Sequence, residues 1–125
     1  MKPQELASFV RCAKSDVSYN EEAKAKFLRD GKRVLRTIAK KLDLRPGSFD
    51  IRINPAGPAV SGEAILHSDQ LYIMLSQSLD GANFMFRSVR GRKDYTGGNN
   101  HWMPWDKLLE LDSACAQFQR VATRG

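Results

Sequence analysis

The sequence predicts an α+β domain in which two N-terminal helices precede a four-stranded antiparallel meander and a C-terminal helix packs on one face of the sheet. Three observations predict this class. Apolar residues recur every three or four positions in the first and last parts of the chain, which is helical spacing. Between residues 49 and 89 they alternate with polar residues, and turn residues separate these segments. The length of 125 residues fits a single domain, 1–125.

Two N-terminal helices are predicted from periodicity and end signals. Residues 3–14 form a short amphipathic helix, and residues 19–43 form a longer one. Ser18 and Glu21 have the capping-box spacing, which predicts that Ser18 caps the second helix. The segment Arg45-Pro46-Gly47 ends that helix, because a proline disfavours helical geometry in the residue before it.

The middle of the chain alternates with a period of two, which is typical of half-buried strands. Turn-length connections between these segments predict a meander, and Pro104 then opens the last helix. His67 comes at a hairpin turn, where we expect it to be exposed. The four predicted strands cover residues 49–54, 59–67, 70–77 and 83–89.

The net charge of +6 is unevenly distributed. Residues 1–47 carry +6, residues 48–86 carry −3 and residues 87–104 carry +3. Such a sided field favours a polyanion on one surface. No apolar run approaches the roughly 18 residues of a membrane span, and the start lacks an apolar signal segment, so we expect a soluble, cytoplasmic protein. The two cysteines, Cys12 and Cys115, are expected to be small buried apolar residues.

The first candidate site is a basic ridge on the side of the second helix that faces solvent. Five cations fall within about 80° of one another opposite the leucine stripe, so they could contact the phosphates of a nucleic acid. The alternative is an ordinary solvated face, because Lys and Arg also favour helix formation and solubility. The ridge consists of Lys26, Arg29, Arg33, Arg36 and Lys40.

The second candidate is the long segment 90–104, dense in glycine, charge and aromatics. Arg90, Arg92 and Lys93 suit phosphates, while Tyr95 and Trp102 suit stacking on bases. The turn Thr96-Gly97-Gly98 would offer backbone N–H groups as an anion nest. The alternative is a structural loop in which the glycines permit positive φ and the tryptophans fill the core.

The third candidate is His101, which would act as a general acid or base with Asp94 orienting it. The alternative is a hydrogen-bonded structural histidine. Two isolated histidines and scattered carboxylates make no metal-ligand cluster, so the sequence predicts neither a metal nor a cofactor.

The run Gly91-Arg92-Lys93-Asp94-Tyr95-Thr96-Gly97-Gly98, followed by Asn100-His101, resembles a segment of small uncharacterised proteins carried by bacterial plasmids and phages. This resemblance implies an accessory protein of a mobile element and assigns no activity. The order of helices and strands on a basic chain also looks like that of the ribosome-dependent messenger RNA interferase toxins, a resemblance of fold only.

Three functions follow from these patterns, and whether the protein is an enzyme stays open among them. The leading hypothesis is a non-catalytic protein that binds nucleic acid or another polyanion through the ridge and the 90–102 loop. The second is a metal-independent ribonuclease that uses His101. The third is a protein-binding inhibitor of a host enzyme or defence system, with the aromatic loop as its anchor. A homodimer could form through Tyr72, Met74 and Met85.

Overall fold

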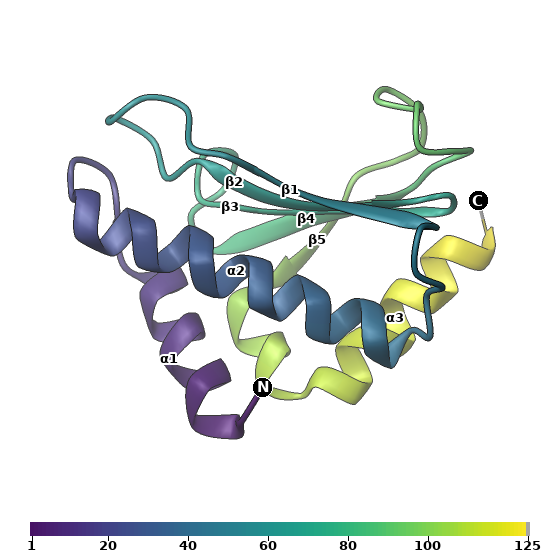
Figure 1. The fold of residues 1–125 in the computed structure, drawn as a ribbon, viewed down its shortest axis with the longest axis horizontal. Coiled ribbons are helices and arrows are strands. Elements are labelled where there is room, and N and C mark those ends of the chain that lie inside the picture. Colours follow the sequence, from purple (N-terminus) through teal and green to yellow (C-terminus); the bar gives the residue numbers. More distant parts are fainter. Residues whose placement is uncertain (125) are drawn as a thin grey trace.

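Five antiparallel strands lie in sequence order across one sheet in the computed structural model, which describes residues 1–124 (Figure 1). All helices cover the same face of this sheet. The α+β class is therefore confirmed, and the C-terminal helix packs on the sheet as predicted. The elements are α1 (Pro3–Lys14), α2 (Glu21–Lys41), β1 (Phe49–Asn54), β2 (Glu63–Ser68), β3 (Leu71–Ser76), β4 (Asn83–Ser88), β5 (His101–Pro104), the 3-10 helix η1 (Trp105–Leu109) and α3 (Leu111–Arg124).

The sheet has a fifth strand, β5, in a segment that the sequence analysis predicts to be a loop. The predicted number of four strands is therefore wrong. The register of β5 sets His101 opposite Phe86 and Pro104 opposite Asn83. Pro104 lacks an N–H but is tolerated because β5 is an edge strand. The helix expected to open at Pro104 is instead the short η1, and α3 begins only at Leu111.

The cap of α2 also differs from the prediction. The side chain of Asn20, not Ser18, accepts a hydrogen bond from the backbone N–H of Ala23 at 3.0 Å. The Ser18 hydroxyl donates to Asp16 at 2.6 Å. Asn20 therefore performs the capping, because a short side-chain oxygen directly before the first turn can reach an unpaired N–H of that turn.

The main core lies between the sheet and the helices. Its centre is Trp105, only 1% exposed, whose indole packs against aromatic rings from three other elements. Ring centroids lie 6.0 Å away for Phe9 and Phe27 and 5.2 Å away for Phe84. The indole N–H donates to the backbone carbonyl of Gly81 at 3.1 Å, so the polar atom of this buried ring is satisfied.

The opposite face of the sheet carries a smaller apolar cluster of Ile65, Tyr72, Met85 and Val89. Two loops, 55–62 and 89–100, rise on this side (Figure 1). We call it the outer face. In the described part of the chain, no helix combines the length and apolarity that crossing a membrane requires.

Candidate functional site

The structure divides the basic ridge of α2 into two parts. On the side next to α1, three of the cations form ion pairs with carboxylates of α1 or α2. Lys26 Nζ lies 2.6 Å from Asp30, and Arg29 Nε lies 3.6 Å from the same carboxylate. Arg33 pairs with Glu5 of α1 at 2.6 Å. This half of the ridge is therefore largely neutralised.

The other two ridge residues, Arg36 and Lys40, lie beside β1. Together with Lys32 they border an open groove between α2 and β1. Among the described residues, none of these three cations forms an ion pair. The unpaired positive charge of α2 is thus concentrated along the groove.

The segment between β4 and β5 is fixed to the outer face by one side chain, Arg87. It is 4% exposed, and its guanidinium donates to the backbone carbonyls of Gly97 and of Asp94, the latter at 3.2 Å. Its Cζ also lies 4.7 Å from the ring centroid of Tyr72, within the range of a cation–π contact. The loop is therefore held down at its middle.

The carboxylate of Asp94 organises the inside of this loop. It accepts hydrogen bonds from the backbone N–H groups of Arg90 at 3.1 Å, Thr96 at 3.2 Å and Gly97 at 2.8 Å. These donors lower the pKa of Asp94 below its ordinary value, led by Arg90 and Gly97. Two N–H groups of the expected anion nest, those of Thr96 and Gly97, are thus already paired with the chain's own carboxylate.

His67, expected to be exposed, is fully buried, and that expectation is wrong. Its imidazole makes edge contacts with Tyr72 and Tyr95, at centroid distances of 5.1 and 5.5 Å. Nε2 lies 3.1 Å from the carbonyl of Gly91, whereas Nδ1 has no hydrogen-bond partner among the described residues. Burial lowers the pKa of His67, so the ring is neutral at pH 7.

The structure does not bring Asp94 to His101. His101 stacks on Phe86 at 5.4 Å, and Phe86 in turn packs against Phe118 of α3, so His101 lies on the helix-covered face. Asp94 lies in the loop held by Arg87, which points to the outer face. An acid-base pair of these two residues is therefore not assembled. Within residues 1–124, no three His, Cys, Asp or Glu side chains gather as a metal site would require.

The loop 89–100 and the neighbouring strand β5 together present two exposed aromatic rings and two exposed cations on the outer face. Tyr95 is 62% exposed and Trp102 is 42% exposed. Trp102 pairs with Met85 and so lies on the outer face. The side chains of Arg90 and Lys93 are exposed and make no ion pair with the described residues.

Arg92, the third cation predicted to hold phosphates, faces acidic side chains instead. Its guanidinium lies 3.6 Å from Asp50 and 3.5 Å from Asp69. We therefore define the outer-face site by four of the predicted residues and leave Arg92 outside it. The outer-face site consists of Arg90, Lys93, Tyr95 and Trp102.

The residues expected at a dimer surface also lie on the outer face. Tyr72 and Met85 are 8% and 6% exposed, and Met74 packs beside them. Most of their surface is already buried within the chain.

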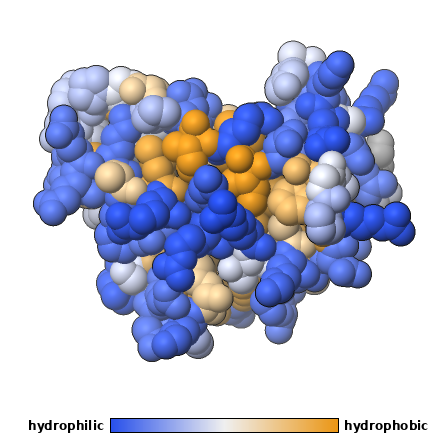
Figure 2. Space-filling view, viewed as in Figure 1, coloured by the Kyte–Doolittle hydropathy of each residue, from blue (hydrophilic) through white to orange (hydrophobic). Residues whose placement is uncertain are grey.

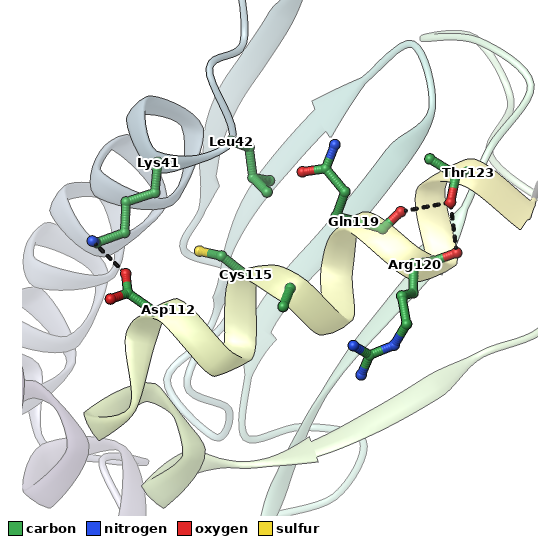
Figure 3. Close-up of a pocket in the computed structure, with 8 residues that line it drawn as sticks. Lys41, Leu42, Asp112, Cys115, Gln119, Arg120 and Thr123 are labelled. Carbon is green, nitrogen blue, oxygen red and sulfur yellow. Dashed lines mark hydrogen bonds and ion pairs between the residues drawn. The ribbon is translucent and has the colours of Figure 1, made fainter.

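A hollow of about 510 Å³ lies between the end of α2 and α3 (Figure 3). An ion pair of Lys41 with Asp112 at 2.7 Å borders it. Burial raises the pKa of the Cys115 thiol, which keeps it protonated. The Thr123 hydroxyl is bonded to carbonyls of its own helix.

No protein-family model, curated protein or solved structure matches this chain. The function must therefore be inferred from the geometry of the chain itself.

Proposed function

We propose that the protein is a non-catalytic binding protein for single-stranded nucleic acid, which it binds at the outer-face site. The observation that carries this proposal is the exposure of two large aromatic rings, Tyr95 and Trp102, on the same side of the sheet as two unpaired cations. Single strands are bound by this combination: bases stack on aromatic rings, and cations contact the phosphates.

The rings are ordered before any ligand arrives. Tyr95 rests against the buried imidazole of His67, and its loop is tied down by Arg87. Trp102 is fixed by the pairing of β5 with β4. A base that stacks here therefore orders little additional structure, and each stack is worth about 1–3 kcal/mol.

A single strand suits this site better than a duplex. Bases in a duplex are stacked on one another, so their flat faces are not available to Tyr95 and Trp102. Arg90 and Lys93 would then contact the backbone without reading its sequence.

The experiment is fluorescence-anisotropy titration with labelled single-stranded RNA, single-stranded DNA and duplex DNA, at about 50 and 200 mM salt. We expect the single strands to bind more tightly than the duplex, with affinity falling as salt rises. Failure of all three to bind at the lower salt concentration would overturn the proposal.

Two variants locate the site. R90E/K93E reverses both free cations, while the matched control R11E/R120E makes the same charge change on exposed positions of α1 and α3. We expect at least about tenfold weaker binding for R90E/K93E than for the control, because lost phosphate contacts add to repulsion. Equal weakening in both variants would show that only the net charge matters.

The stacking of a base on Trp102 can be detected by tryptophan fluorescence. Trp102 is the exposed tryptophan and Trp105 is buried, so base stacking should quench the fluorescence of Trp102 alone. Quenching should disappear in W102F, whereas the buried Trp105 continues to emit.

The ribonuclease hypothesis is checked on the same samples by gel electrophoresis of the RNA. If the wild type shortens the RNA and H101A leaves it intact, the function is cleavage and not binding alone.

A further inference from the structure

An open groove with an apolar floor lies between α2 and β1, the first strand of the sheet. Its floor contains Ala39, Leu44, Phe49 and Ile51, and it has a volume of about 540 Å³. Hydrophobic side chains gather in the middle of this face, directly above the hydrophilic side chains of α2 (Figure 2). The groove therefore offers apolar contact with a rim of charge.

One wall of the groove is the unpaired edge of the sheet. β1 is the first strand in the sheet order, so only one of its sides is paired, with β2. Within residues 1–124, no backbone group outside the sheet bonds to its free side. Every second residue of its six therefore presents an unpaired N–H and C=O, the template for an additional strand.

The other wall supplies three cations in a row that have no ion-pair partner among residues 1–124. Lys32, Arg36 and Lys40 follow one another at four-residue intervals, about 6 Å apart along the helix axis. Side chains on one face of an extended chain recur about every 6.8 Å. Because α2 and β1 run alongside one another (Figure 1), a strand added to β1 would bring alternate side chains past this row.

We propose that the β1–α2 groove binds an extended acidic segment of a partner protein, which adds to the sheet as a sixth strand beside β1. Its backbone pairs with the free edge of β1. Its helix-facing positions carry carboxylates opposite Lys32, Arg36 and Lys40, and a large apolar side chain over Phe49 and Ile51. This mode combines backbone pairing for affinity with alternate side chains for specificity.

Two other occupants fit these observations less well. A second copy of the chain, paired through its own β1, would bring the three groove cations of one copy towards those of the other, and like charges at an interface are costly. A nucleic acid would satisfy the cations, but it has neither a peptide backbone for the free edge nor aliphatic side chains for the floor.

The test is selection from a phage-displayed library of random peptides on three immobilised proteins: the wild type, the groove variant R36E/K40E and the control R11E/R120E. Arg36, Lys40, Arg11 and Arg120 are all exposed helical positions, so the two variants have equal net charge. We expect the wild type and the control to enrich peptides with Asp or Glu at alternating positions beside a large apolar residue. Recovery on the groove variant should fall at least about tenfold.

The most enriched peptide is then titrated into ¹⁵N-labelled protein. We expect amide shifts in residues 49–54 and slowed hydrogen exchange on the free side of β1, as pairing requires. The variant R90E/K93E should bind this peptide as tightly as the wild type does. A failure of the groove proposal can therefore be distinguished from a failure of the nucleic-acid proposal.

Three outcomes would overturn the inference. One is enrichment of no acidic motif, and another is equal recovery on wild type and groove variant. The third is a dimer of the free protein, detected by light scattering, whose interface maps to residues 49–54, because that would assign the edge to a second copy.

Discussion

Arg87 lies over the ring of Tyr72, with its Cζ 4.7 Å from the ring centroid, and from there reaches the carbonyls of two loop residues. Arg87 is only 4% exposed, so its positive charge is stabilised by the loop carbonyl dipoles and by the face of the Tyr72 ring in place of water. This arrangement joins β3, β4 and the loop 89–100 through one side chain. It also places Tyr95 against His67, where the proposed nucleic-acid site needs it.

Replacing Arg87 by alanine should release the loop. The variant loses charge-assisted hydrogen bonds and a cation–π contact, so we expect the free energy of unfolding in urea to fall by about 2–4 kcal/mol. Amide exchange in residues 94–97 should accelerate more than exchange in β3. The control is R11A, an exposed position that forms no ion pair with the described residues, which should change stability by less than about 0.5 kcal/mol. Similar losses in both variants would contradict the role given to Arg87.

His67 makes stability depend on pH. Burial holds the pKa of His67 below its ordinary value of 6.5, whereas the unfolded chain titrates near that value. As the pH falls below about 6.5, the unfolded state takes up the proton first, so the free energy of unfolding decreases until the folded pKa is reached. The stabilisation is fully present above pH 6.5 and is lost on the acid side.

The pH dependence can be assigned with two variants. H67Q keeps a neutral N–H donor for the Gly91 carbonyl and should abolish the part of the acid-side loss of stability that begins below about pH 6.5. H101Q alters the exposed histidine and should retain it. Urea unfolding at several pH values measures both, and a slope that survives in H67Q but disappears in H101Q would refute the assignment.

Periodicity was sufficient to predict α1, α2, β1, β3 and β4 to within two residues, because each shows several repeats of its pattern. The strand predicted over 59–67 was wrong at its start, since β2 begins only at Glu63. The strand β5 could not be found in this way, since four residues ending in Pro104 carry too little alternation. Its position depends on pairing with β4, a contact across the 89–100 loop. The break between η1 and α3 falls at Glu110, whose backbone lies outside the helical region (φ −110°, ψ 64°).

The candidate sites were predicted less completely than the fold. The sequence shows which charged residues share a helix face, but it does not show which residues they contact in the folded chain. A helical projection of α2 puts Arg33 on the ridge, yet its partner Glu5 lies 28 positions earlier in the sequence. The burial of His67 likewise depends on Tyr95, which reaches it from a distant loop. The groove was missed because it needs both α2 and the edge position of β1. A clue was available in Lys32 and Arg36, which share one side of the predicted helix.

Both cysteines should react slowly with a thiol reagent while the protein is folded. Burial raises the pKa of Cys12 and of Cys115, and the thiolate is the reactive form. With Ellman's reagent near pH 8, we expect each to react at least about tenfold more slowly than in the urea-unfolded protein. Cys12, which is half-buried, should react before Cys115, and comparing C12S with C115S measures the order. Faster reaction of Cys115 would show that the hollow beside α3 opens more than the structure indicates.

Gly31 sets how closely α2 approaches the sheet. A Cβ at this position would lie 3.3 Å from the Cβ of Ala64 and 3.5 Å from a ring carbon of Phe9. G31A should therefore change stability by less than about 1 kcal/mol, because tight contact offsets the higher helix propensity of alanine. G31V adds two methyl groups beyond a Cβ that is already in tight contact with Ala64, and we expect a loss of about 1–3 kcal/mol in urea unfolding.

The control is A25V, which also places valine in α2 but at an exposed alanine, and which should cost only the helix-propensity difference between alanine and valine, about 0.5 kcal/mol. The comparison isolates the approach of helix to sheet, because both variants place valine in the same helix. If G31V were as stable as A25V, α2 would have to lie farther from β2 than the Ala64 contact requires. The walls of the groove would then be set by something other than this contact, and its geometry would no longer follow from the packing of Gly31.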